Sequence, residues 1–354
     1  MTVVDDNRYV IGNNSGLGIG GGIVTTSTQV SLALWQNNFS GTRIRMSEGI
    51  QKRTLATSYD QTYTQAFGGG GVAWLSMAID SSDVVHVLAI ADSDQTRDIA
   101  YNTFTPGGTG WGTWEQIAPW ANGVPTAPGG HISIDSSDVP HVLYVQTLKY
   151  HGATHDAIAY SGGGSGSWSA EAEVSNAENV AYYRPSMTHC PADDIEAFYF
   201  KTGTGPAYTR RNGSWAAEST YARSTDVIAW PGVICTRGDN VYRYHGPNPG
   251  IPRENNVAIG SDSASTVESV AALVSGYRIF FVHHPTSNFY RVYTYHGSEW
   301  IGIATMMSSC ENLIALNAYN NNPQSAVAKF TANTLTGQRQ YGRYLGHRVF
   351  NTHV

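Results

Sequence analysis

A segment of twelve residues occurs twice in this chain, and the repetition constrains the fold more than any other feature. Residues 77–88 read MAIDSSDVVHVL and residues 132–143 read ISIDSSDVPHVL, a spacing of about 55 residues. Each copy continues to an Ile-Ala-Tyr sequence, a glycine-rich turn and a tryptophan, which is Trp114 in the first copy and Trp168 in the second. A period of this size that carries alternating strands and turns predicts the blades of a β-propeller.

The composition agrees with an all-β fold built from short strands and tight turns. Charged residues make up only 14% of the chain, whereas 38 of the 354 residues are glycine and 21 are tyrosine. Glycine supplies turns, and aromatic residues favour pleated, half-buried surfaces. No segment keeps apolar residues at helical spacing over several turns, so the sequence predicts no long amphipathic helix. In both repeats the Asp-Ser-Ser-Asp sequence offers side-chain acceptors for a turn between two strands.

We expect a single propeller domain over residues 1–354, made of four-stranded antiparallel sheets. The predicted blades cover residues 23–67, 68–120, 121–177, 178–224, 225–263, 264–307 and 308–354, with residues 1–22 as a lead-in or closing segment. The sequence favours seven blades. Six result if Arg8–Ile11 and the C-terminal strands share one blade, because such pairing of the two ends removes an open sheet edge.

A glycine-rich run at Gly16–Gly22 superficially resembles a dinucleotide-binding loop. No helix is expected after it and no βαβ unit surrounds it, so we predict no cofactor. The formal net charge of −6 and the pI near 6.0 argue against a nucleic-acid partner, because phosphate binding needs a surplus of Lys and Arg. No run of about 18 apolar residues is present, which predicts that the chain has no membrane span.

The polar residues of this sequence are mainly Ser, Thr, Asn, Gln and Gly, and the chain has only four lysines. Such a composition is common in extracellular and virion proteins. The N-terminus lacks the basic start and apolar core of a signal peptide. An outward-facing composition without an export signal is typical of a bacteriophage particle protein, which leaves the cell by lysis; it also fits a chain whose signal has been removed. We therefore expect a virion or extracellular location.

Three cysteines, Cys190, Cys235 and Cys310, fall in three different predicted blades. Their number is odd, and their spacing is neither that of a zinc site nor that of a paired disulfide framework. We therefore expect buried thiols that act as small hydrophobic residues, and no disulfide. The adjacent histidines His283 and His284 would point to opposite faces of a strand, so we predict no metal site either.

The chain also contains three hairpins that end in tryptophan: Ser161–Trp168, Arg211–Trp215 and His296–Trp300. With the Ile-Asp-Ser-Ser-Asp-Val-x-His-Val pattern, they resemble the BNR-repeat propellers, the sialidase-like superfamily, although each hairpin lacks the aspartate that defines the Asp-box. The resemblance covers residues 68–215 and, more loosely, 264–304. It implies the fold more than an activity, because members include sialidases, polysaccharide lyases, lectin-like modules and phage surface proteins. In the two clear repeats, we expect the tryptophan that follows each glycine-rich hairpin to pack between blades.

The enzymes of this superfamily need residues that the sequence only partly supplies. A sialidase uses three arginines, a Tyr–Glu pair and an acidic proton donor. Arginines are available but stand in no identifying motif, and Glu196 is the only glutamate well placed in a repeat strand. A polysaccharide lyase would use His or Tyr as the base beside a uronate carboxylate. If the protein is a lyase, we expect Tyr150, His151 and His155 to carry the reaction; otherwise we predict no catalytic residue.

The residues best suited to ligand binding lie in loops where the repeats differ, chiefly 92–98 against 146–156. Aromatic rings can stack on sugar faces, while Asp, His and Arg side chains bond hydroxyl groups. His86 and His141 occupy equivalent repeat positions, so we expect structural roles for both. The predicted ligand-binding residues are Arg97, Tyr150, His151, His155, Asp156, Arg184 and His245.

Without an identifiable acid–base pair, the sequence favours recognition over catalysis. We expect a non-enzymatic surface propeller, namely a phage virion structural, decoration or receptor-binding protein that engages host-surface glycan and other virion proteins. The first alternative is a secreted polysaccharide lyase or glycoside hydrolase of sialidase-like fold, with the lyase favoured over the sialidase. The second is a lectin-like module of a bacterial surface protein.

Overall fold

The computed structural model describes 30 β-strands and, between residues 72 and 258, most of the loops and side chains. Before residue 72 and after residue 258 it describes only the strand backbone, within the bounds given below. Residues 183, 184 and 234 are likewise described by their backbone alone. The segments between 72 and 258 that lie outside the described part are 92–97, 107–109, 121–122, 124, 126–127, 148–149, 151–154, 165, 176–181, 191, 222–231, 236–238 and 246–252.

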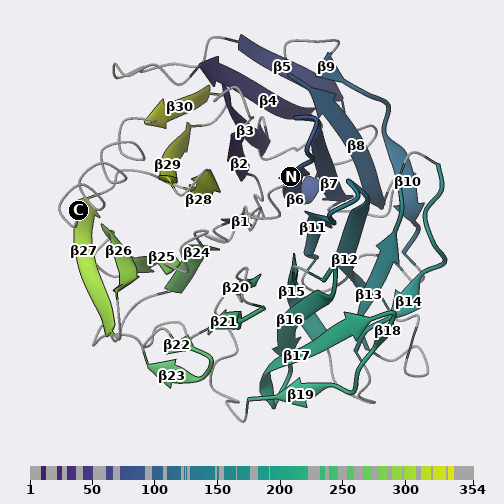
Figure 1. The fold of residues 1–354 in the computed structure, drawn as a ribbon. Coiled ribbons are helices and arrows are strands. Elements are labelled where there is room, and N and C mark those ends of the chain that lie inside the picture. Colours follow the sequence, from purple (N-terminus) through teal and green to yellow (C-terminus); the bar gives the residue numbers. More distant parts are fainter. Residues whose placement is uncertain are drawn as a thin grey trace.

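The described strands form seven antiparallel sheets, which we call blades 1 to 7 in chain order (Figure 1). Blade 1 contains β2 (Gly22–Thr25), β3 (Val30–Gln36), β4 (Arg43–Ile50) and β5 (Gln61–Ala66). Blade 2 contains β6 (Val72–Ile79), β7 (Val85–Ala91), β8 (Ile99–Thr105), β9 (Gly110–Trp111) and β10 (Glu115–Ala118). Blade 3 contains β11 (Gly130–Ile134), β12 (Pro140–Gln146), β13 (Ala157–Gly162) and β14 (Ala172–Glu173).

The remaining blades follow the same order. Blade 4 contains β15 (Tyr182–His189), β16 (Ile195–Lys201), β17 (Gly205–Asn212), β18 (Ser214–Trp215) and β19 (Ser219–Thr220). Blade 5 contains β20 (Gly232–Cys235), β21 (Val241–His245), β22 (Arg253–Glu254) and β23 (Val257–Ala258). Blade 6 contains β24 (Thr266–Ala272), β25 (Arg278–His284), β26 (Phe289–His296) and β27 (Glu299–Met307). Blade 7 contains β1 (Tyr9–Gly12), β28 (Asn312–Tyr319), β29 (Asn322–Thr331) and β30 (Thr334–Gln338).

Contacts between neighbouring blades form a closed ring. β2, β6, β11, β15, β20, β24 and β28 each contact the next strand in this order, and β28 contacts β2 again. Figure 1 shows the sheets arranged around a common centre, with β1 close to it. β1 pairs antiparallel with β28, from Tyr9 opposite Leu316 to Gly12 opposite Leu313. The prediction of an all-β propeller of four-stranded antiparallel sheets is therefore confirmed, with one further short strand in blade 2 (β9) and one in blade 4 (β19).

The Asp-Ser-Ser-Asp sequence forms the turn between the first two strands of blades 2 and 3. In blade 2 the Asp80 carboxylate accepts hydrogen bonds from the backbone N–H groups of Ser82 and Val84, at 2.9 and 2.8 Å. The last residue of the turn has a left-handed backbone, which aspartate tolerates better than most residues do. In four successive blades its φ lies between 59° and 64°, at Asp83, Asp138, Asp193 and Asp239.

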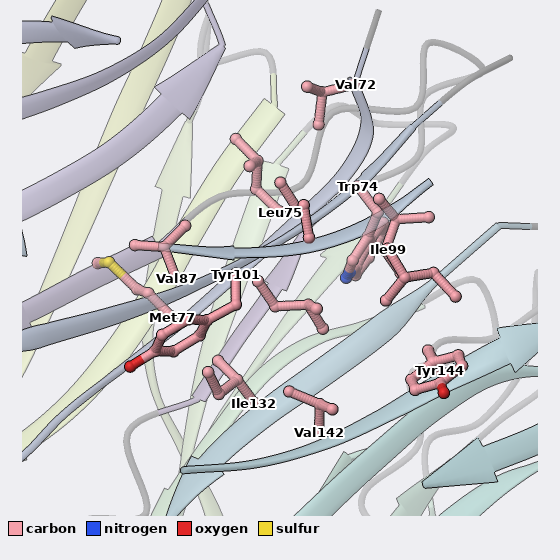
Figure 2. Close-up of a cluster of buried hydrophobic side chains, with 14 of the residues drawn as sticks. Val72, Trp74, Leu75, Met77, Val87, Ile99, Tyr101, Ile132, Val142 and Tyr144 are labelled. Atoms are coloured by element: carbon pink, nitrogen blue, oxygen red, sulfur yellow. The ribbon is translucent and has the colours of Figure 1, made fainter. Parts of the chain in front are cut away.

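Apolar side chains are buried on both faces of the sheets, between neighbouring blades. Every residue of β6 and β7 is buried. Figure 2 shows Trp74 of blade 2 in one cluster with Ile132 and Val142 of blade 3. The indole Nε1 of Trp74 also donates a hydrogen bond to the Gly130 carbonyl, at 2.6 Å. Apolar runs that cover both faces of a strand therefore reflect stacking of the blades on each other.

Within the described ranges, no helix is long and apolar enough to cross a membrane.

The repeat places a tryptophan at the same position in successive blades, but sequence comparison selected the wrong one in blade 2. Trp111, and not Trp114, is the structural equivalent of Trp168. In each blade the residue after this tryptophan donates its N–H to a carbonyl of the third strand: Gly112 to Thr103 in blade 2 and Ser169 to Gly162 in blade 3. The two hairpins differ in length, so counting from the Ile-Ala-Tyr sequence did not reveal the correct match.

Candidate functional site

Blade 2 contains a chain of hydrogen bonds that joins an aspartate, a histidine and a tyrosine. His86 Nε2 lies 3.1 Å from Asp80 Oδ2, and His86 Nδ1 lies 2.6 Å from the Tyr101 hydroxyl. The same two contacts, at the same distances, recur in blade 3 among Asp135, His141 and Tyr160. Because His86 and Tyr101 are buried and both ring nitrogens of each histidine are engaged, these groups link the turn and two strands within each blade, a structural role of the kind expected for His86 and His141.

A tryptophan of the following blade packs on the tyrosine of each chain. The rings of Trp168 and Tyr101 meet edge-on, with centres 5.0 Å apart, and those of Trp215 and Tyr160 do the same at 5.4 Å. Glu115 of blade 2 fixes the first contact by accepting a hydrogen bond from Trp168 Nε1 at 2.9 Å. The expectation of packing between blades is confirmed for Trp168, and Trp215 packs in the same way.

Hydrogen bonds also join the turns of neighbouring blades. Ser81 of blade 2 donates its N–H, at 2.9 Å, and its hydroxyl to the carboxylate of Asp138 in blade 3. Ser136 of blade 3 donates the same two groups to Asp193 in blade 4. We call this arrangement the Ser–Asp clamp. It closes the interface between blades 2 and 3 and the interface between blades 3 and 4.

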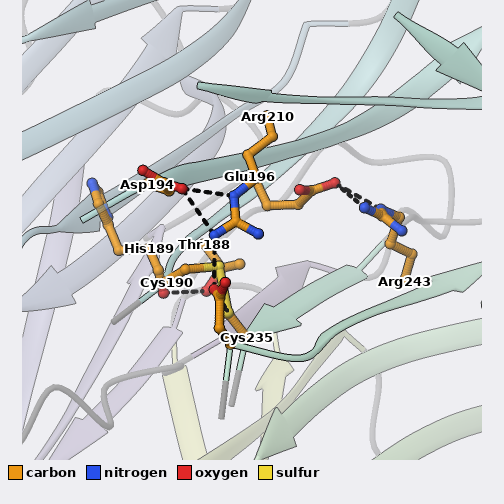
Figure 3. The surroundings of a disulfide bond; sticks show 9 residues. Thr188, His189, Cys190, Asp194, Glu196, Arg210, Cys235 and Arg243 are labelled. Carbon is orange, nitrogen blue, oxygen red and sulfur yellow. Dashed lines mark hydrogen bonds and ion pairs between the residues drawn. A yellow bond between two sulfur atoms is a disulfide. The ribbon is translucent and has the colours of Figure 1, made fainter. Parts of the chain in front are cut away.

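The interface between blades 4 and 5 is built differently. Cys190 occupies the turn position that is aspartate in blades 2 and 3, and it forms a disulfide with Cys235 of blade 5 (Figure 3). The prediction of buried thiols without a disulfide is therefore wrong. Both side chains are buried, but the ring places the two turns side by side, with Cα atoms 5.3 Å apart. The 45 residues between the cysteines are about one blade, a relation that cysteine spacing alone does not reveal.

Arg210 crosses the same interface. Its Nε donates to Asp194 Oδ2 at 2.9 Å, and its Nη2 donates to Asp239 Oδ1 at 2.7 Å. Burial lowers the pKa of Arg210, but the two carboxylates outweigh burial and raise it overall. Cys190, Cys235 and Asp239 bring two sulfurs and a carboxylate oxygen within 4.8 Å of one another. Since the sulfurs are bonded to each other and Asp239 accepts from Arg210, we assign no metal to this cluster.

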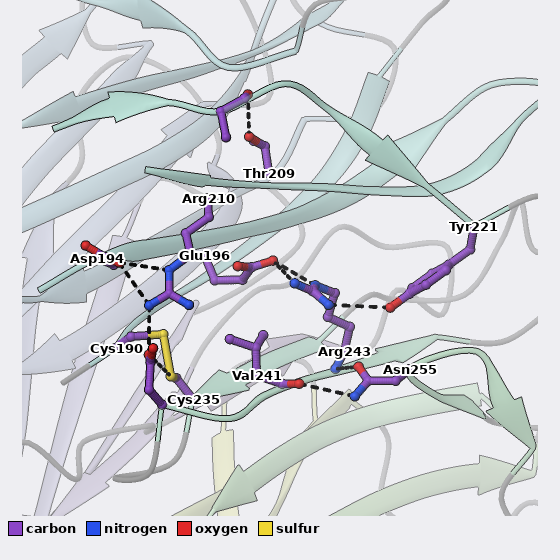
Figure 4. Close-up of polar contacts among 12 residues, drawn as sticks. Cys190, Asp194, Glu196, Thr209, Arg210, Tyr221, Cys235, Val241, Arg243 and Asn255 are labelled. Atoms are coloured by element: carbon purple, nitrogen blue, oxygen red, sulfur yellow. Dashed lines mark hydrogen bonds and ion pairs between the residues drawn. A yellow bond between two sulfur atoms is a disulfide. The ribbon is translucent and has the colours of Figure 1, made fainter. Parts of the chain in front are cut away.

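Glu196 stands where blades 2 and 3 have their histidine, and it pairs with Arg243 of blade 5 (Figure 4). Arg243 Nε and Nη2 lie 2.7 and 2.5 Å from Glu196 Oε1. The guanidinium carbon of Arg243 lies 3.8 Å from the ring centre of Tyr208, the blade 4 equivalent of Tyr101. An arginine thus covers the tyrosine that a tryptophan covers at the two preceding interfaces.

Tyr221 and His245 complete this group of side chains. Arg243 Nη1 lies 3.5 Å from the Tyr221 hydroxyl, and the rings of Tyr208 and Tyr221 are 5.1 Å apart. Tyr221 also stacks on His245, with ring centres 5.3 Å apart. Glu196 and His245 are fully buried, whereas Tyr208, Tyr221 and Arg243 are partly exposed. We call these five residues the Arg243 cluster.

The charges of the Arg243 cluster depend on each other. Burial raises the pKa of the Glu196 carboxyl, and the guanidinium of Arg243 opposes that rise. Burial likewise raises the pKa of Tyr221, again opposed by Arg243. A buried carboxylate is costly unless it is paired and hydrogen-bonded. Glu196 therefore holds Arg243 in place, and the arginine offers its remaining N–H groups beside two partly exposed rings.

Two of the predicted site residues, Tyr150 and Asp156, lie in blade 3. Tyr150 is bonded to Glu171, and Asp156 directly precedes β13. The Tyr150 hydroxyl donates to Glu171 Oε1 at 2.6 Å. Burial and the Glu171 carboxylate both raise the pKa of Tyr150, so its hydroxyl stays protonated at neutral pH. Asp156 is buried, and its carbonyl accepts the N–H of Tyr182 at 3.1 Å.

The other predicted residues are spread over different blades. His245 belongs to the Arg243 cluster, and His155 is partly exposed in blade 3. Arg97, His151 and the side chain of Arg184 lie outside the described residues. Sequence reasoning noted Glu196 and His245 but did not single out Arg243 or its two tyrosines. The available signal was the third copy of the turn, which replaces the repeat's aspartate and histidine with Cys190 and Glu196.

The fold and this cluster define a β-propeller with an aromatic and polar group at one blade interface. No protein-family model and no curated protein sequence matches the chain.

Among solved structures, the six-bladed, fucose-recognising lectin of Aleuria aurantia is 10% identical, with a TM-score of 0.51 over 85% of this chain and 97% of the lectin. The α-L-arabinanase of Penicillium chrysogenum is 12% identical, with a TM-score of 0.49 over 90% and 97% of the two chains. An ulvan lyase is 6% identical, with a TM-score of 0.45 over 91% and 82%. The likeness to the lectin shows the β-propeller fold.

Proposed function

We propose that the protein is a carbohydrate-recognition propeller that binds neutral sugars at the Arg243 cluster without cleaving them. One observation carries the proposal: Arg243, fixed by Glu196, lies beside the partly exposed rings of Tyr208 and Tyr221. Aromatic rings provide an apolar face for a pyranose ring, and a fixed guanidinium donates to hydroxyl groups in a defined direction. These are the two kinds of contact that a sugar requires.

The balance of charge at the interface favours a neutral sugar. Glu196 neutralises Arg243, and Arg210 is bonded to two carboxylates, those of Asp194 and Asp239. A sugar acid would bring a further negative charge to a group that has no surplus positive charge. Hydroxyl groups need only donors and acceptors, which the arginine and the tyrosine hydroxyls supply.

The glutamates of this part of the chain support binding over hydrolysis. A glycosidase needs two carboxyl groups free to act on the substrate. Here the carboxylates serve instead as acceptors for neighbouring side chains: Glu115 for Trp168, Glu171 for Tyr144, Glu196 for Arg243, Glu218 for Tyr199 and Glu254 for Tyr244. The raised pKa of Tyr150 likewise makes it a poor base for a lyase.

The solved lectin supports the proposal from a second direction. Its fucose recognition is a property of a six-bladed β-propeller, so the shared fold is compatible with sugar binding. The chain's scarcity of lysine and the disulfide at the cluster support exposure outside the cell, because disulfides persist in oxidising surroundings. We extend the proposal to a sialidase-like propeller on a phage particle or a cell surface, where it would engage host glycan together with other particle proteins.

A glycan array followed by calorimetry with methyl glycosides of fucose, galactose and arabinose tests the proposal. We expect millimolar or tighter binding of at least one neutral sugar and none of glucuronate or sialate. Tyr221→Ala should weaken that binding at least tenfold, because it removes one ring and one hydroxyl. The control is Arg211→Ala, since Arg211 covers Tyr160 at the interface between blades 3 and 4. Silence on every neutral sugar, or equal loss in the control, would contradict the proposal.

A further inference from the structure

The interface between blades 4 and 5 cannot be closed by a Ser–Asp clamp. The clamp needs the N–H and hydroxyl of the residue after the first turn position, which is Ser81 in blade 2 and Ser136 in blade 3. In blade 4 this residue is Pro191, and proline has neither group. Asp239, the turn residue that would accept the clamp, bonds Arg210 instead.

The contact between a tryptophan and the tyrosine of the preceding blade, found at the two earlier interfaces, is also replaced. Where Trp168 covers Tyr101 with an apolar indole, Arg243 covers Tyr208 with a charged guanidinium. The indole contact brings no charge to the interface. The arginine contact requires Glu196 at hydrogen-bond distance, because separation would leave a buried carboxylate unpaired. The disulfide is thus the covalent element that takes over from the clamp.

We propose that the interface between blades 4 and 5 is redox-dependent: the Cys190–Cys235 disulfide keeps it closed, and reduction opens it while the interfaces closed by Ser–Asp clamps stay shut. Glu196 and Tyr208 belong to blade 4, whereas Arg243 belongs to blade 5. Opening therefore takes the Arg243 cluster apart. If the Arg243 cluster binds sugar, as proposed above, the protein loses sugar binding on reduction.

The chemistry is thiol–disulfide exchange with an external dithiol as the reductant. One thiolate of the dithiol attacks a sulfur of the disulfide, forms a mixed disulfide and releases the other cysteine, which takes up a proton. The second thiol then displaces the remaining cysteine, so that the dithiol becomes a disulfide and two electrons pass to Cys190 and Cys235. Since both cysteines are buried, attack requires the interface to open first, and reduction is slow in the folded protein.

Thermal unfolding and amide exchange, with and without dithiothreitol, test the closed interface itself. After thiol titration has shown two additional free thiols, we expect Tm to fall by about 5–10 °C. Exchange should rise in β16, β20 and β21 and stay unchanged in β6, β7 and β11. Unchanged Tm and exchange in the reduced protein would overturn the proposal, as would a uniform rise across all blades.

Two variants separate the loss of the disulfide from general damage. Cys190→Ser with Cys235→Ser should show the Tm of the reduced protein and no response to dithiothreitol. Cys190→Asp with Pro191→Ser and Cys235→Ser restores the repeat sequence at the turn, so that the introduced serine can donate to Asp239. We expect this variant to regain part of the lost Tm and to remain insensitive to the reductant. A variant that regained nothing would show that the clamp and the disulfide are not equivalent, which contradicts the proposal.

Calorimetry with methyl α-L-fucoside and methyl β-D-galactoside tests the coupling to the Arg243 cluster. We expect at least tenfold weaker binding in the reduced protein and restored binding in the clamp-restoring variant. If the oxidised protein binds no sugar, the proposed function fails, while Tm and exchange still decide the redox-dependent interface. If exchange rises on reduction but sugar affinity stays the same, the coupling is wrong.

Discussion

Trp168 of blade 3 meets Tyr101 of blade 2 edge-on, with ring centres 5.0 Å apart, and Tyr101 in turn bonds His86 within its own blade. The tryptophan therefore links one blade to the hydrogen-bond chain of its neighbour. Glu115 sets the angle of this contact, because its two carboxylate oxygens accept Trp168 Nε1 at 2.9 Å and the Gly166 N–H at 2.7 Å.

Replacing Glu115 with alanine should lower the free energy of unfolding by about 1–3 kcal/mol, because a charged acceptor for two donors is lost. Urea unfolding provides the measurement. Trp168→Phe removes one of the two donors. The losses of unfolding free energy in Trp168→Phe and Glu115→Ala should therefore sum to more than the loss measured in the double variant. Strict additivity in this double-mutant cycle would show that the indole and the carboxylate do not interact.

The Ser–Asp clamp makes a prediction about Asp138, which accepts from Ser81 and has a φ of 63°. Asp138→Ala should cost about 2–3 kcal/mol, because two hydrogen bonds are lost and alanine is strained in the left-handed region. Asp138→Asn should cost about 1 kcal/mol, since asparagine tolerates this backbone and keeps one acceptor oxygen. Chemical denaturation checks both values, and an equal cost for the two variants would contradict the role of the clamp.

Two buried histidines should make the protein sensitive to acid. Burial lowers the pKa of His131 to about 3, and burial together with the neighbouring His141 lowers that of His189 to about 3. Both are neutral in the folded state, while the unfolded chain protonates near pH 6.5. The free energy of unfolding should thus be independent of these groups above pH 6.5 and fall below it, by up to about 1.4 kcal/mol per pH unit for each histidine.

Urea titrations between pH 7 and pH 4 measure this slope. The double variant His131→Gln, His189→Gln should be less stable at pH 7 but lose stability less steeply towards pH 4. His155→Gln, at a partly exposed position, is the matched control and should keep the steep slope. The interpretation is wrong if the double variant and the control share one slope.

Glu171 is the acceptor for three side chains of blade 3, so its loss should be severe. It accepts from Tyr144 at 2.7 Å, from Gln146 at 2.8 Å and from Tyr150 at 2.6 Å, and Tyr144 is fully buried. Glu171→Ala should lower the free energy of unfolding by about 2–4 kcal/mol, because the buried donors lose their partner. Glu171→Gln should cost less, and Tyr150→Phe about 1 kcal/mol. Thermal unfolding distinguishes the three; a mild alanine variant would show that these bonds are replaceable.

The repeat explains why the fold was predictable from the sequence. Asp80 and Asp135 end the first strand and bond the turn, while His86 and His141 return to them from the second strand. Each residue of the repeated sequence thus acts within one blade or on its nearest neighbour, and a single copy already specifies the unit. The all-β architecture followed from that local information.

The candidate site was less predictable because it depends on contacts between different copies. Cys190 and Cys235 are neighbours only in the closed ring, and Arg243 reaches Glu196 across 47 residues. No spacing rule for disulfides or ion pairs covers such a separation. The informative signal was the departure of Cys190 and Glu196 from the repeat, and it becomes readable only after the blades have been aligned.

The pairing of β1 with β28 has a consequence for how the molecule is made. Strand Tyr9–Gly12 finds its partner Leu313–Leu316 about 300 residues later, so blades 1 to 6 leave the ribosome before the two strands can meet. Until then the growing chain is an open arc with two exposed edges, held only by contacts between consecutive blades. Completion of the ring is a single late event of very high contact order, and it converts a stepwise row of sheets into one cooperative unit.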